Sequence, residues 1–363
     1  MKLYYIANAR IPTEKAHGIQ IMKMCEAFAS RGVEVTLLVP QRFNYIRSDP
    51  FEYYSVKNNF KIRYIFTIDT VKLGKLGFFI ESFLFSAFSV SYCLVKDPDN
   101  IYSRDELPLY FLSFLGKRFY WESHTFKNSF VSRRVLKYST KIITITKNLK
   151  EKYNNQNILV SPDAVDLDFF DIRLSKEEAK KELGLPLNKK IVLYTGHLYP
   201  WKGAHVLIDA SRYLSKDIIV VFVGGTIEDI ADFKNKTDKL QNIIIIGHKL
   251  YKDIPKYLKA ADVLVLPNSG EEDISKKYTS PMKLFEYMVS GRPIIASDLK
   301  SIREILNESN SYLIESDNPT LLASTIENVL SRDTAKITMQ AYGDVRRYTW
   351  TKRAESILTF ITH

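Results

Sequence analysis

A lysine at the end of a glycine-bounded loop is the first residue that could do chemistry in this sequence. The loop, residues 196–203, follows an apolar run at 191–195 and leads into a helical pattern, with Lys202 near its end. Backbone N–H groups and the dipole at the start of a helix attract an anion, and an ammonium group adds a full positive charge. The loop therefore predicts an anion site, although lysine is also common in loops that only cap a helix.

A glutamate within an apolar helical pattern is the second candidate. The polar residues 278–280 lead to Pro281, which suits the first turn of a helix, and the pattern ends at Gly291. Glu286 lies among apolar neighbours, where a carboxylate needs donors, and a pair of ribose hydroxyls would supply them. The loop N–H groups could bind a diphosphate. The alternative is a glutamate on the solvent side of the helix.

The loop after the first strand-like run is the third candidate. This loop, residues 8–18, is long and polar, and Gly18 would let the backbone approach a ligand closely. The glycine fingerprint of dinucleotide-binding proteins is absent, which disfavours a nicotinamide or flavin enzyme. For His17 and Gly18 the alternative is a plain helix start.

Short apolar runs that alternate with helical patterns must position these loops. This alternation predicts βαβ units and an α/β fold with parallel sheets covered on both faces. In such sheets, ligands bind at the carboxyl ends of the strands. The strand-like runs are 3–7, 33–39, 62–66, 101–103, 118–121, 141–146 and 158–160 in the first half, and 191–195, 218–223, 242–246, 263–266 and 293–296 in the second.

The 363 residues suit two domains better than one hydrophobic core. Residues 161–175 contain a proline, several acidic residues and little strand pattern, so we place the connection there. The predicted domains are residues 1–165 and 166–349.

Cys25 and Cys93 lie in apolar helical patterns, where buried free thiols are expected rather than disulfides or a metal cluster. The sequence starts as a strand without the apolar stretch of a signal peptide, which predicts a cytoplasmic protein.

Positive charge is concentrated in the first half of the chain. Residues 1–160 contain 24 Lys and Arg against 13 Asp and Glu, whereas residues 161–363 contain 28 of each. The excess favours an anionic partner for the first half, which could be a membrane surface, a phosphorylated acceptor or a nucleic acid. Plain solubility charge is an equally good explanation.

Residues 76–95 are apolar except for Glu81 and scattered serines, with Lys72 and Lys75 before them and Lys96 after them. Their length would permit a membrane span, but Glu81 and the need for a helix at this point of the βαβ series argue against one. We expect a buried core helix. The functional alternative is a surface helix that dips into lipid headgroups.

Several motifs in a fixed order resemble the family 4 glycosyltransferases. The most specific is 280–294, Ser-Pro-Met-Lys-Leu-Phe-Glu-Tyr-Met-Val-Ser-Gly-Arg-Pro-Ile, which is similar to the family's donor-site helix and contains the second glutamate of its Glu-x7-Glu motif. Gly196 with Lys202-Gly203, the glycine pair 224–225, residues 260–267 and the linker 163–170 also match. The resemblance covers almost the whole chain. It implies a GT-B fold, in which two facing Rossmann-like domains enclose an inter-domain cleft.

The resemblance implies a donor site in the second domain. Lys202 should neutralise the donor diphosphate, Glu286 should hold the ribose hydroxyls, and the nucleobase should lie near Gly247 and His248. Further donor contacts are expected from Gly196, from Tyr278 and from the backbone of Ser280, Pro281, Met282 and Lys283.

In the first domain, the resemblance places Gly18 close to the reacting centre. It also places His124 where the family often has a histidine that faces the donor sugar. Together with Lys202 and Glu286, His124 is therefore a candidate catalytic residue. The last segment, 350–363, is similar to a final helix that packs back on the first domain.

Two positions depart from the family pattern. His197 replaces a usual arginine, so its help to a phosphate would depend on pH. Tyr278 replaces the first glutamate of the motif, which usually touches the donor sugar, and this leaves the identity of that sugar open.

The implied activity is retaining transfer of a hexose from a nucleotide-sugar to a sugar or lipid-linked acceptor, without a metal or cofactor. Cell-surface polysaccharide synthesis would fit. The enzyme would work in the cytoplasm, where its basic first half could attach it peripherally to the inner face of the membrane.

The main alternative is a non-catalytic nucleotide-sugar-binding subunit of the same fold. A nucleotide-sugar epimerase would leave the basic half unexplained. A nucleic-acid-binding protein is disfavoured, because the basic residues are scattered and form no recognised motif.

Overall fold

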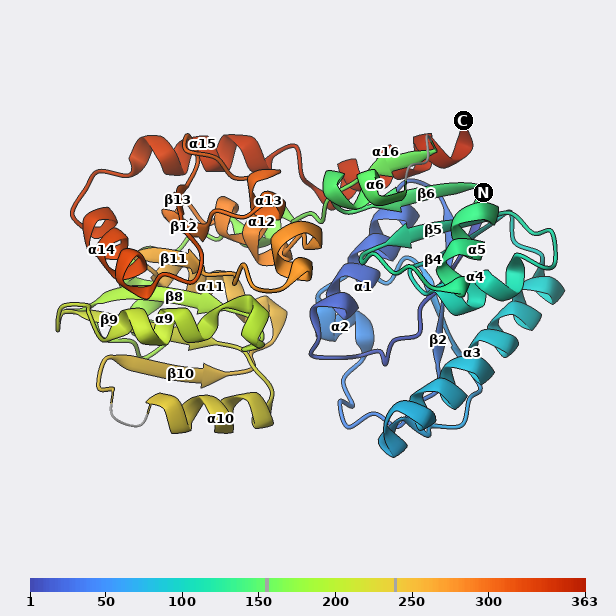
Figure 1. The fold of residues 1–363 in the computed structure, drawn as a ribbon, viewed down its shortest axis with the longest axis horizontal. Helices are drawn as coiled ribbons and strands as arrows, with labels where there is room; N and C mark the ends of the chain where they lie inside the picture. The colour runs from blue at the N-terminus through green and yellow to red at the C-terminus, as the bar shows by residue number, and fades with distance from the viewer. Residues whose placement is uncertain (154–156, 238–239) are drawn as a thin grey trace. The chain divides into compact units, whose positions relative to one another are not determined.

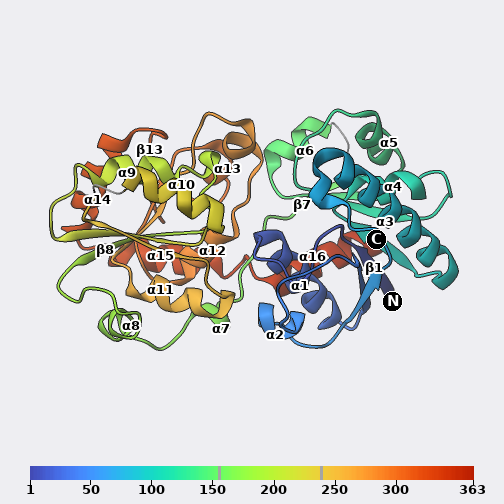
Figure 2. The same ribbon diagram turned by 90° about the horizontal axis from the view of Figure 1, so that it is seen from below.

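The structure is a computed structural model that describes residues 1–153, 157–237 and 240–363. Contacts divide the chain into two compact units (Figure 1). Unit 1 comprises Met1–Pro162 and Trp350–His363, and unit 2 comprises Asp163–Thr349. Each unit is built around one parallel sheet with helices on both faces (Figure 2).

The sheet of unit 1 has β1 near its centre. Its described residues form seven parallel strands in the order β3-β2-β1-β4-β5-β6-β7. β1 pairs with β2 on one side and with β4 on the other, so that Tyr5 lies between Leu37 and Tyr102. The strands are β1 Lys2–Ile6, β2 Glu34–Pro40, β3 Lys61–Ile65, β4 Asn100–Ser103, β5 Phe119–Ser123, β6 Lys141–Thr144 and β7 Ile158–Val160.

Helices cover both faces of this sheet. α1 packs against the last helix of the chain, α16, while α3 packs against α4 and α4 against α5 on the opposite face (Figure 2). The helices are α1 Ala16–Ala29, α2 Pro50–Tyr54, the 3-10 turn η1 Val71–Leu73, α3 Gly74–Lys96, α4 Glu106–Leu112, α5 Phe130–Tyr138, α6 Lys147–Tyr153 and α16 Trp350–Thr362.

The sheet of unit 2 follows the same plan. Its described residues form six parallel strands in the order β10-β9-β8-β11-β12-β13, and β8 lies between β9 and β11. The strands are β8 Lys190–Thr195, β9 Ile218–Val223, β10 Ile243–Gly247, β11 Val263–Leu266, β12 Ile294–Ser297 and β13 Tyr312–Ile314.

The helices of unit 2 pack in pairs, α9 with α14, α8 with α11 and α12 with α15. The helices and helical turns are α7 Leu167–Phe170, α8 Lys176–Glu182, the 3-10 turn η2 Pro200–Lys202, α9 Ala204–Ser211, α10 Ile227–Thr237, the 3-10 turn η3 Tyr251–Asp253, α11 Ile254–Ala260, the π turn η4 Ile274–Tyr278, α12 Met282–Val289, α13 Lys300–Arg303, α14 Pro319–Leu330 and α15 Ala335–Val345.

Local sequence explains where these elements form. β9 reads Ile-Ile-Val-Val-Phe-Val and is buried throughout, as expected for a parallel strand covered on both faces. Side chains cap several helix starts, because Asp49 before α2 and Asn318 before α14 accept hydrogen bonds from first-turn N–H groups. Ser175 and Glu178 form a reciprocal capping box at the start of α8.

The predicted fold class, α/β with two Rossmann-like parallel sheets, is confirmed. Every strand-like run of the sequence corresponds to a strand, with ends shifted by at most two residues. The sequence pattern does not predict β13, because its three residues are only partly buried and follow a polar stretch.

The expectation that residues 76–95 form a buried core helix is wrong. They lie in α3, which leaves large apolar side chains exposed, among them Leu76, Phe79, Phe83 and Val95. The polar exception in the sequence, Glu81, is fully buried. Periodicity alone does not reveal which side of a helix faces the protein, and here the buried side includes the glutamate and three serines.

A fully buried ion pair attaches α16 to the rest of unit 1. Arg353 donates to Glu122 over 2.8 Å and to the carbonyl oxygen of Pro162 over 2.8 Å. The Arg353 and Glu122 side chains are 2% and 0% exposed. Glu355 of α16 forms a second ion pair with Arg31, which follows α1. This pair lies at the surface, where the Arg31 and Glu355 side chains are 39% and 46% exposed.

We expect Arg353→Ala to lower the free energy of unfolding of unit 1 by about 3–5 kcal/mol, because the Glu122 carboxylate would stay buried without this counter-charge. Arg31→Ala is the matched control and should cost no more than about 1 kcal/mol, as for most exposed pairs. Urea denaturation followed by circular dichroism measures both. Equal, small losses would show that the buried pair does not hold α16.

The same experiment has a defined pH dependence. Burial alone would raise the pKa of Glu122, but Arg353 and the hydrogen bond from His124 hold it well below its usual value. A carboxylate with a lowered native pKa stabilises the fold above its unfolded-state pKa, about 4.3, and this contribution is lost as the pH falls through the native pKa. The difference between wild type and Arg353→Ala should therefore shrink in acid.

Candidate functional site

The carboxyl edge of the unit 2 sheet gathers most of the predicted site residues. The chain order reverses at β8, which pairs with β9 on one side and with β11 on the other. Loops that leave the sheet on the two sides of such a switch point leave room for a ligand between them. The loop after β8 contains Lys202, and the chain after β11 leads through η4 to α12.

Lys202 ends η2, directly before α9. Gly203 follows it with φ 69°, and a Cβ there would lie 1.6 Å from the carbonyl oxygen of Pro267, so only glycine fits. This close approach holds the loop after β8 against the loop after β11. Burial lowers the pKa of Lys202 to about 8, and the carboxylates of Asp229 and Glu286 oppose the shift.

Lys283, in the first turn of α12, brings a second ammonium group to this edge. Its side chain is buried, and Nζ lies 3.8 Å from the ring centre of Tyr194. Among the described residues, that Nζ has no hydrogen-bond acceptor. Burial and the charge of Lys202 hold the pKa of Lys283 well below its usual value, against the pull of Glu286. A buried amine without an acceptor is costly and marks a place that an anion would complete.

Glu286 lies one turn further along α12 and is buried. Burial raises its pKa to about 7, although the Tyr251 hydroxyl donates to it and the charges of Lys283 and Lys202 act in the opposite direction. The carboxylate keeps further acceptor capacity beside the Tyr251 bond, because each of its oxygens has two lone pairs. Such an acceptor next to two lysines suits a ligand that has hydroxyl groups beside an anionic group.

Hydrogen bonds to distant parts of the chain fix α12 and the loop before it. The Ser280 hydroxyl accepts the N–H of Asp163 over 3.0 Å, and Pro281 caps the helix before Met282. Tyr278 is buried at the end of η4. Tyr287, on the next turn, accepts the N–H of Thr195 over 2.8 Å and so ties α12 to the end of β8.

Four other predicted residues lie at the ends of β8 and β10. A Cβ at Gly196 would lie 3.9 Å from Nζ of Lys283, which places that backbone beside the buried amine. The His197 ring stacks on Tyr199 with ring centres 5.0 Å apart, and its Nδ1 lies 3.9 Å from Asp229. Gly247 ends β10, and the exposed His248 follows it.

His124 lies in unit 1, after β5, and is oriented by Glu122. Its Nε2 lies 2.7 Å from Glu122 Oε1, which also accepts Gln20 Nε2 and Arg353. Burial and the charge of Arg104 lower the pKa of His124 to about 4, against the pull of Glu122. The imidazole is therefore neutral near pH 7, with Nε2–H donating to the carboxylate and Nδ1 left as an acceptor.

Gly18 lies in the first turn of α1, where the structure gives a packing reason for glycine. A Cβ there would come within 2.2 Å of the Tyr54 hydroxyl and 2.7 Å of a methyl group of Thr13. Its neighbour His17 has its pKa lowered to about 3 by burial and by Arg104, among other charges. Contact of Gly18 with a ligand stays a prediction.

Within unit 2, the structure thus brings Lys202, Glu286, Gly196 and the start of α12 to one edge. The sequence predicted only a backbone role for Lys283, not one for its side chain, and it did not predict roles for Glu122 and Tyr251. A glutamate inside the aromatic β5, next to His124, was the visible signal for Glu122. In the part of the chain that the structure describes, no three His, Cys, Asp or Glu side chains are grouped to hold a metal ion.

Comparison with known proteins agrees with this geometry. Residues 189–332, which include β8 to α14, match the family model described as Glycosyl transferases group 1. Spore coat protein SA of Bacillus subtilis (strain 168) is 29% identical over 203 residues, which are 51% of this chain and 52% of that protein. The UDP-Gal:alpha-D-GlcNAc-diphosphoundecaprenol alpha-1,3-galactosyltransferase of Escherichia coli is 30% identical over 178 residues, 46% of this chain and 44% of that one. The chain spans about half the length of the curated relatives it matches.

The fold is shared along the whole chain with solved structures. Anabaena Alr3699/HepE, crystallised in complex with UDP-glucose, superposes with a TM-score of 0.79 over 100% of this chain and 99% of that one, at 16% identity. The similarity to the Glycosyl transferases group 1 model thus covers residues 189–332, and the fold is shared over the whole chain with the Anabaena structure.

Proposed function

We propose that the chain transfers a sugar from a nucleoside-diphosphate sugar to an acceptor hydroxyl. One observation carries this proposal: unit 2 brings two lysines, the half-buried Lys202 and the buried Lys283, to the buried carboxylate of Glu286. A nucleotide-sugar offers a diphosphate for the lysines and ribose hydroxyls for the carboxylate. The family match and the UDP-glucose held by the Anabaena structure support the same ligand class.

Each part of the site has a role in this proposal. Lys202, Lys283 and the N–H groups at the start of α12 bind the diphosphate, and Glu286 accepts the ribose hydroxyls. Gly247 and His248 lie beside the nucleobase, at the end of β10. Tyr278 stands where an acidic residue would contact the sugar. The backbone of Ser280 and Met282 lies around that sugar.

The proposed reaction is retaining and uses no metal. As the bond from the sugar to the phosphate lengthens, negative charge builds on the departing diphosphate, and fixed ammonium groups stabilise it electrostatically. The acceptor hydroxyl attacks from the same face, and the leaving phosphate takes its proton, so no protein nucleophile is required. His124 contributes a neutral acceptor, held by Glu122, for a hydroxyl of the donor sugar.

The proposed acceptor is a sugar or a lipid-linked glycan that unit 1 receives. The name of the Escherichia coli relative specifies a diphosphoundecaprenol-linked sugar as its acceptor, which supports a lipid-linked one here. The excess positive charge of residues 1–160 would suit the phosphates of such an acceptor. Synthesis of a cell-surface polysaccharide, from the cytoplasmic side, is the proposed setting.

A non-catalytic nucleotide-sugar-binding subunit is the second candidate. It rests on Tyr278 and His197, which replace the residues usual at those two positions of the donor site. The two candidates differ in turnover, because the subunit would bind the donor without hydrolysing or transferring it.

The central test is a thermal-shift screen against UDP-, GDP-, ADP- and TDP-sugars, followed by calorimetry and a donor-hydrolysis assay. A ligand that binds only the native state raises the melting temperature by mass action. Lys202→Ala and Glu286→Gln should each weaken donor binding about tenfold or more, since each removes a charge-assisted contact. Lys216→Ala, which changes an exposed lysine of the same unit, is the control. Wild-type affinity in both site variants would overturn the assignment.

Donor affinity should fall on the alkaline side of pH 8. The pKa of Lys202 in the ligand-free protein is about 8. Above that pH the amine must take up a proton when the donor binds, so the association constant should drop by about tenfold per pH unit. Calorimetry with the nucleotide-sugar measures this, because a diphosphate diester has no proton that titrates near neutral pH. In Lys202→Arg this charge is permanent, so the part of the alkaline fall that Lys202 causes should disappear and the slope should become shallower, with any remaining fall due to Lys283. An unchanged fall would assign it to another group.

Lys283→Met should separate stability from binding. Removal of a buried amine that lacks an acceptor should raise the free energy of unfolding of the ligand-free protein by about 0.5–2 kcal/mol, and donor binding should be lost. Because the native pKa of Lys283 is lowered, the unfolded state binds more protons, so the gain should be larger at lower pH.

Lys180→Met is the matched control for this substitution. Lys180 is equally buried, but its Nζ donates to Asp262 over 3.0 Å and to the carbonyl oxygen of Lys189 over 2.8 Å. Its replacement should therefore destabilise the fold. Destabilisation by Lys283→Met of the same size would mean that Lys283 is a structural lysine.

A further inference from the structure

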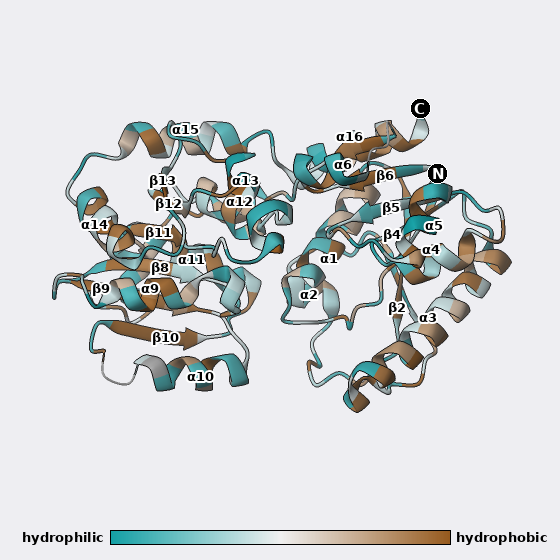
Figure 3. Cartoon of the chain, in the orientation of Figure 1, coloured by the Kyte–Doolittle hydropathy of each residue, from teal (hydrophilic) through white to brown (hydrophobic). Residues whose placement is uncertain are grey.

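The helix α3 buries its more polar side. Eight of its residues are buried, and four of these are Glu81, Ser82, Ser86 and Ser89. On the outside it exposes large apolar side chains, among them Leu76, Phe79, Ile80, Phe83, Phe88 and Val95. Figure 3 shows the hydrophobic colour along α3. A surface helix of a soluble protein normally has the reverse arrangement, with its apolar stripe on the core.

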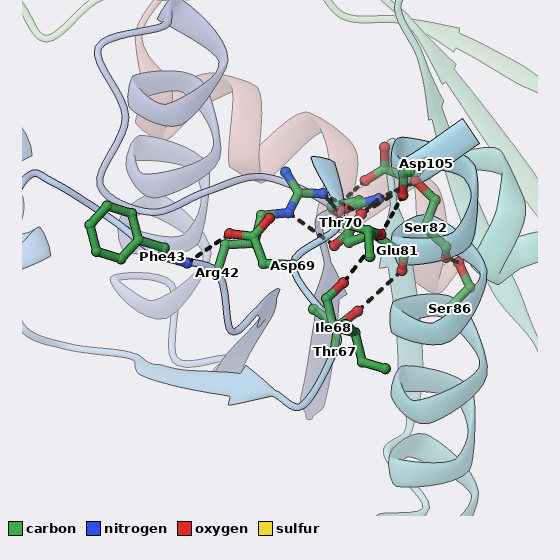
Figure 4. Close-up of polar contacts among 12 residues, drawn as sticks. Arg42, Phe43, Thr67, Ile68, Asp69, Thr70, Glu81, Ser82, Ser86 and Asp105 are labelled. Atoms are coloured by element: carbon green, nitrogen blue, oxygen red, sulfur yellow. Dashed lines mark hydrogen bonds and ion pairs between the residues drawn. The ribbon is translucent and has the colours of Figure 1, made fainter. Parts of the chain in front are cut away.

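Polar bonds hold the inward side in place. Arg42, after β2, donates to both carboxylate oxygens of Glu81, over 2.9 and 2.5 Å. Asn8, after β1, donates to Ser82 over 2.9 Å, and Thr70 donates to the carbonyl oxygen of Gly77 over 2.7 Å. Figure 4 shows this cluster between the helix and the strand ends. The helix cannot roll to bury its apolar side without leaving Glu81 and Arg42 unpaired.

The apolar surface extends beyond α3 through aromatic contacts. Phe83 packs on Phe111 of α4 with ring centres 5.4 Å apart, and Tyr110 on the same helix contacts both Phe114 and Phe130. Phe114 and Phe130 are 58% and 68% exposed. The α3 surface, defined as the outward side of α3 with Phe114 and Phe130, thus crosses three neighbouring helices of unit 1.

Basic residues border this surface. Residues 61–96 contain five Lys and Arg against two Asp and Glu, one of which is the paired Glu81. Residues 126–141, which include α5, contain five Lys and Arg and no acidic residue. Lys72 and Lys75 are exposed at the start of the helix. A second copy of the chain would bring the same positive charge to this surface, so the charge favours an anionic partner.

We propose that the α3 surface lies on an anionic lipid bilayer, with its aromatic and aliphatic side chains at the depth of the headgroups and acyl chain ends. Lys72, Lys75 and the arginines of α5 contact the lipid phosphates. α3 is long and apolar enough to cross a membrane, and only 39% of its most apolar stretch is buried. It lies on the bilayer rather than across it, because its inward side carries the Glu81–Arg42 pair and remains packed on unit 1.

Flotation of the full chain with vesicles tests this proposal without a donor, so the result is independent of sugar transfer. The protein should float with vesicles of phosphatidylcholine and phosphatidylglycerol and much less with phosphatidylcholine alone. High salt should weaken the binding, because it screens the lysines. Phe79→Glu should reduce partition about tenfold or more, since it puts a charge in place of an exposed ring that would enter the bilayer. Lys72→Gln with Lys75→Gln should reduce it about tenfold on anionic vesicles only.

Two further variants keep the test decisive. Tyr213→Glu, at a 59% exposed residue of unit 2, should leave partition unchanged. In Phe79→Trp, the new indole should shift its emission to shorter wavelength on anionic vesicles and be quenched by brominated lipids, which reports insertion even if Phe79→Glu misfolds. Failure of the wild type to float with anionic vesicles would overturn the proposal. A dimer in sedimentation that Phe79→Glu abolishes, without flotation, would instead assign the surface to a second copy.

Discussion

The cost of removing charge from water separates structural from functional groups in this chain. In unit 1 the deeply buried charges are paired: Glu122 with Arg353, and Glu81 with Arg42. In unit 2 the Lys283 amine is buried beside another cation and lacks a hydrogen-bond acceptor among the described residues. A fold gains nothing from such an arrangement by itself, because burial of an uncompensated amine is unfavourable. The asymmetry is therefore the physical reason to assign an anionic ligand to unit 2, and the family match agrees with it.

Most of the fold could be predicted from the sequence, because parallel strands covered on both faces need continuous apolar runs, and these are visible. β13 escaped the pattern because it is short and only partly buried. The sequence also could not predict which side of α3 packs on the rest of unit 1, because a run of apolar residues around one glutamate suggests a core helix. Only the position of Arg42, 39 residues earlier in the chain, shows that the glutamate belongs inside.

For the candidate site, the glycine-bounded loop before a helix pointed to Lys202, and the carboxylate among apolar residues, which is unusual locally, pointed to Glu286. The side chain of Lys283 looked like one more helix lysine. Its significance depends on what surrounds it in three dimensions, namely the Tyr194 ring and the nearby Lys202. Glu122 stays ionised inside the protein because it pairs with Arg353, 231 residues later in the chain. A local sequence pattern cannot predict a pairing over such a separation.

The polar side of α3 connects the proposed membrane surface to the strand ends of unit 1. Asn8 follows β1, at the switch point of the sheet, and its side chain bonds Ser82 while its N–H bonds Asp105 over 2.6 Å. A bilayer in contact with the outward side of α3 would thus lie one helix diameter, about 10 Å, from the edge where parallel sheets bind ligands. An acceptor anchored in that bilayer would need only a short polar reach to meet this edge. In the proposed arrangement the polar side of α3 packs at the sheet edge and its apolar side would contact lipid. A soluble acceptor would leave the exposed apolar side unexplained.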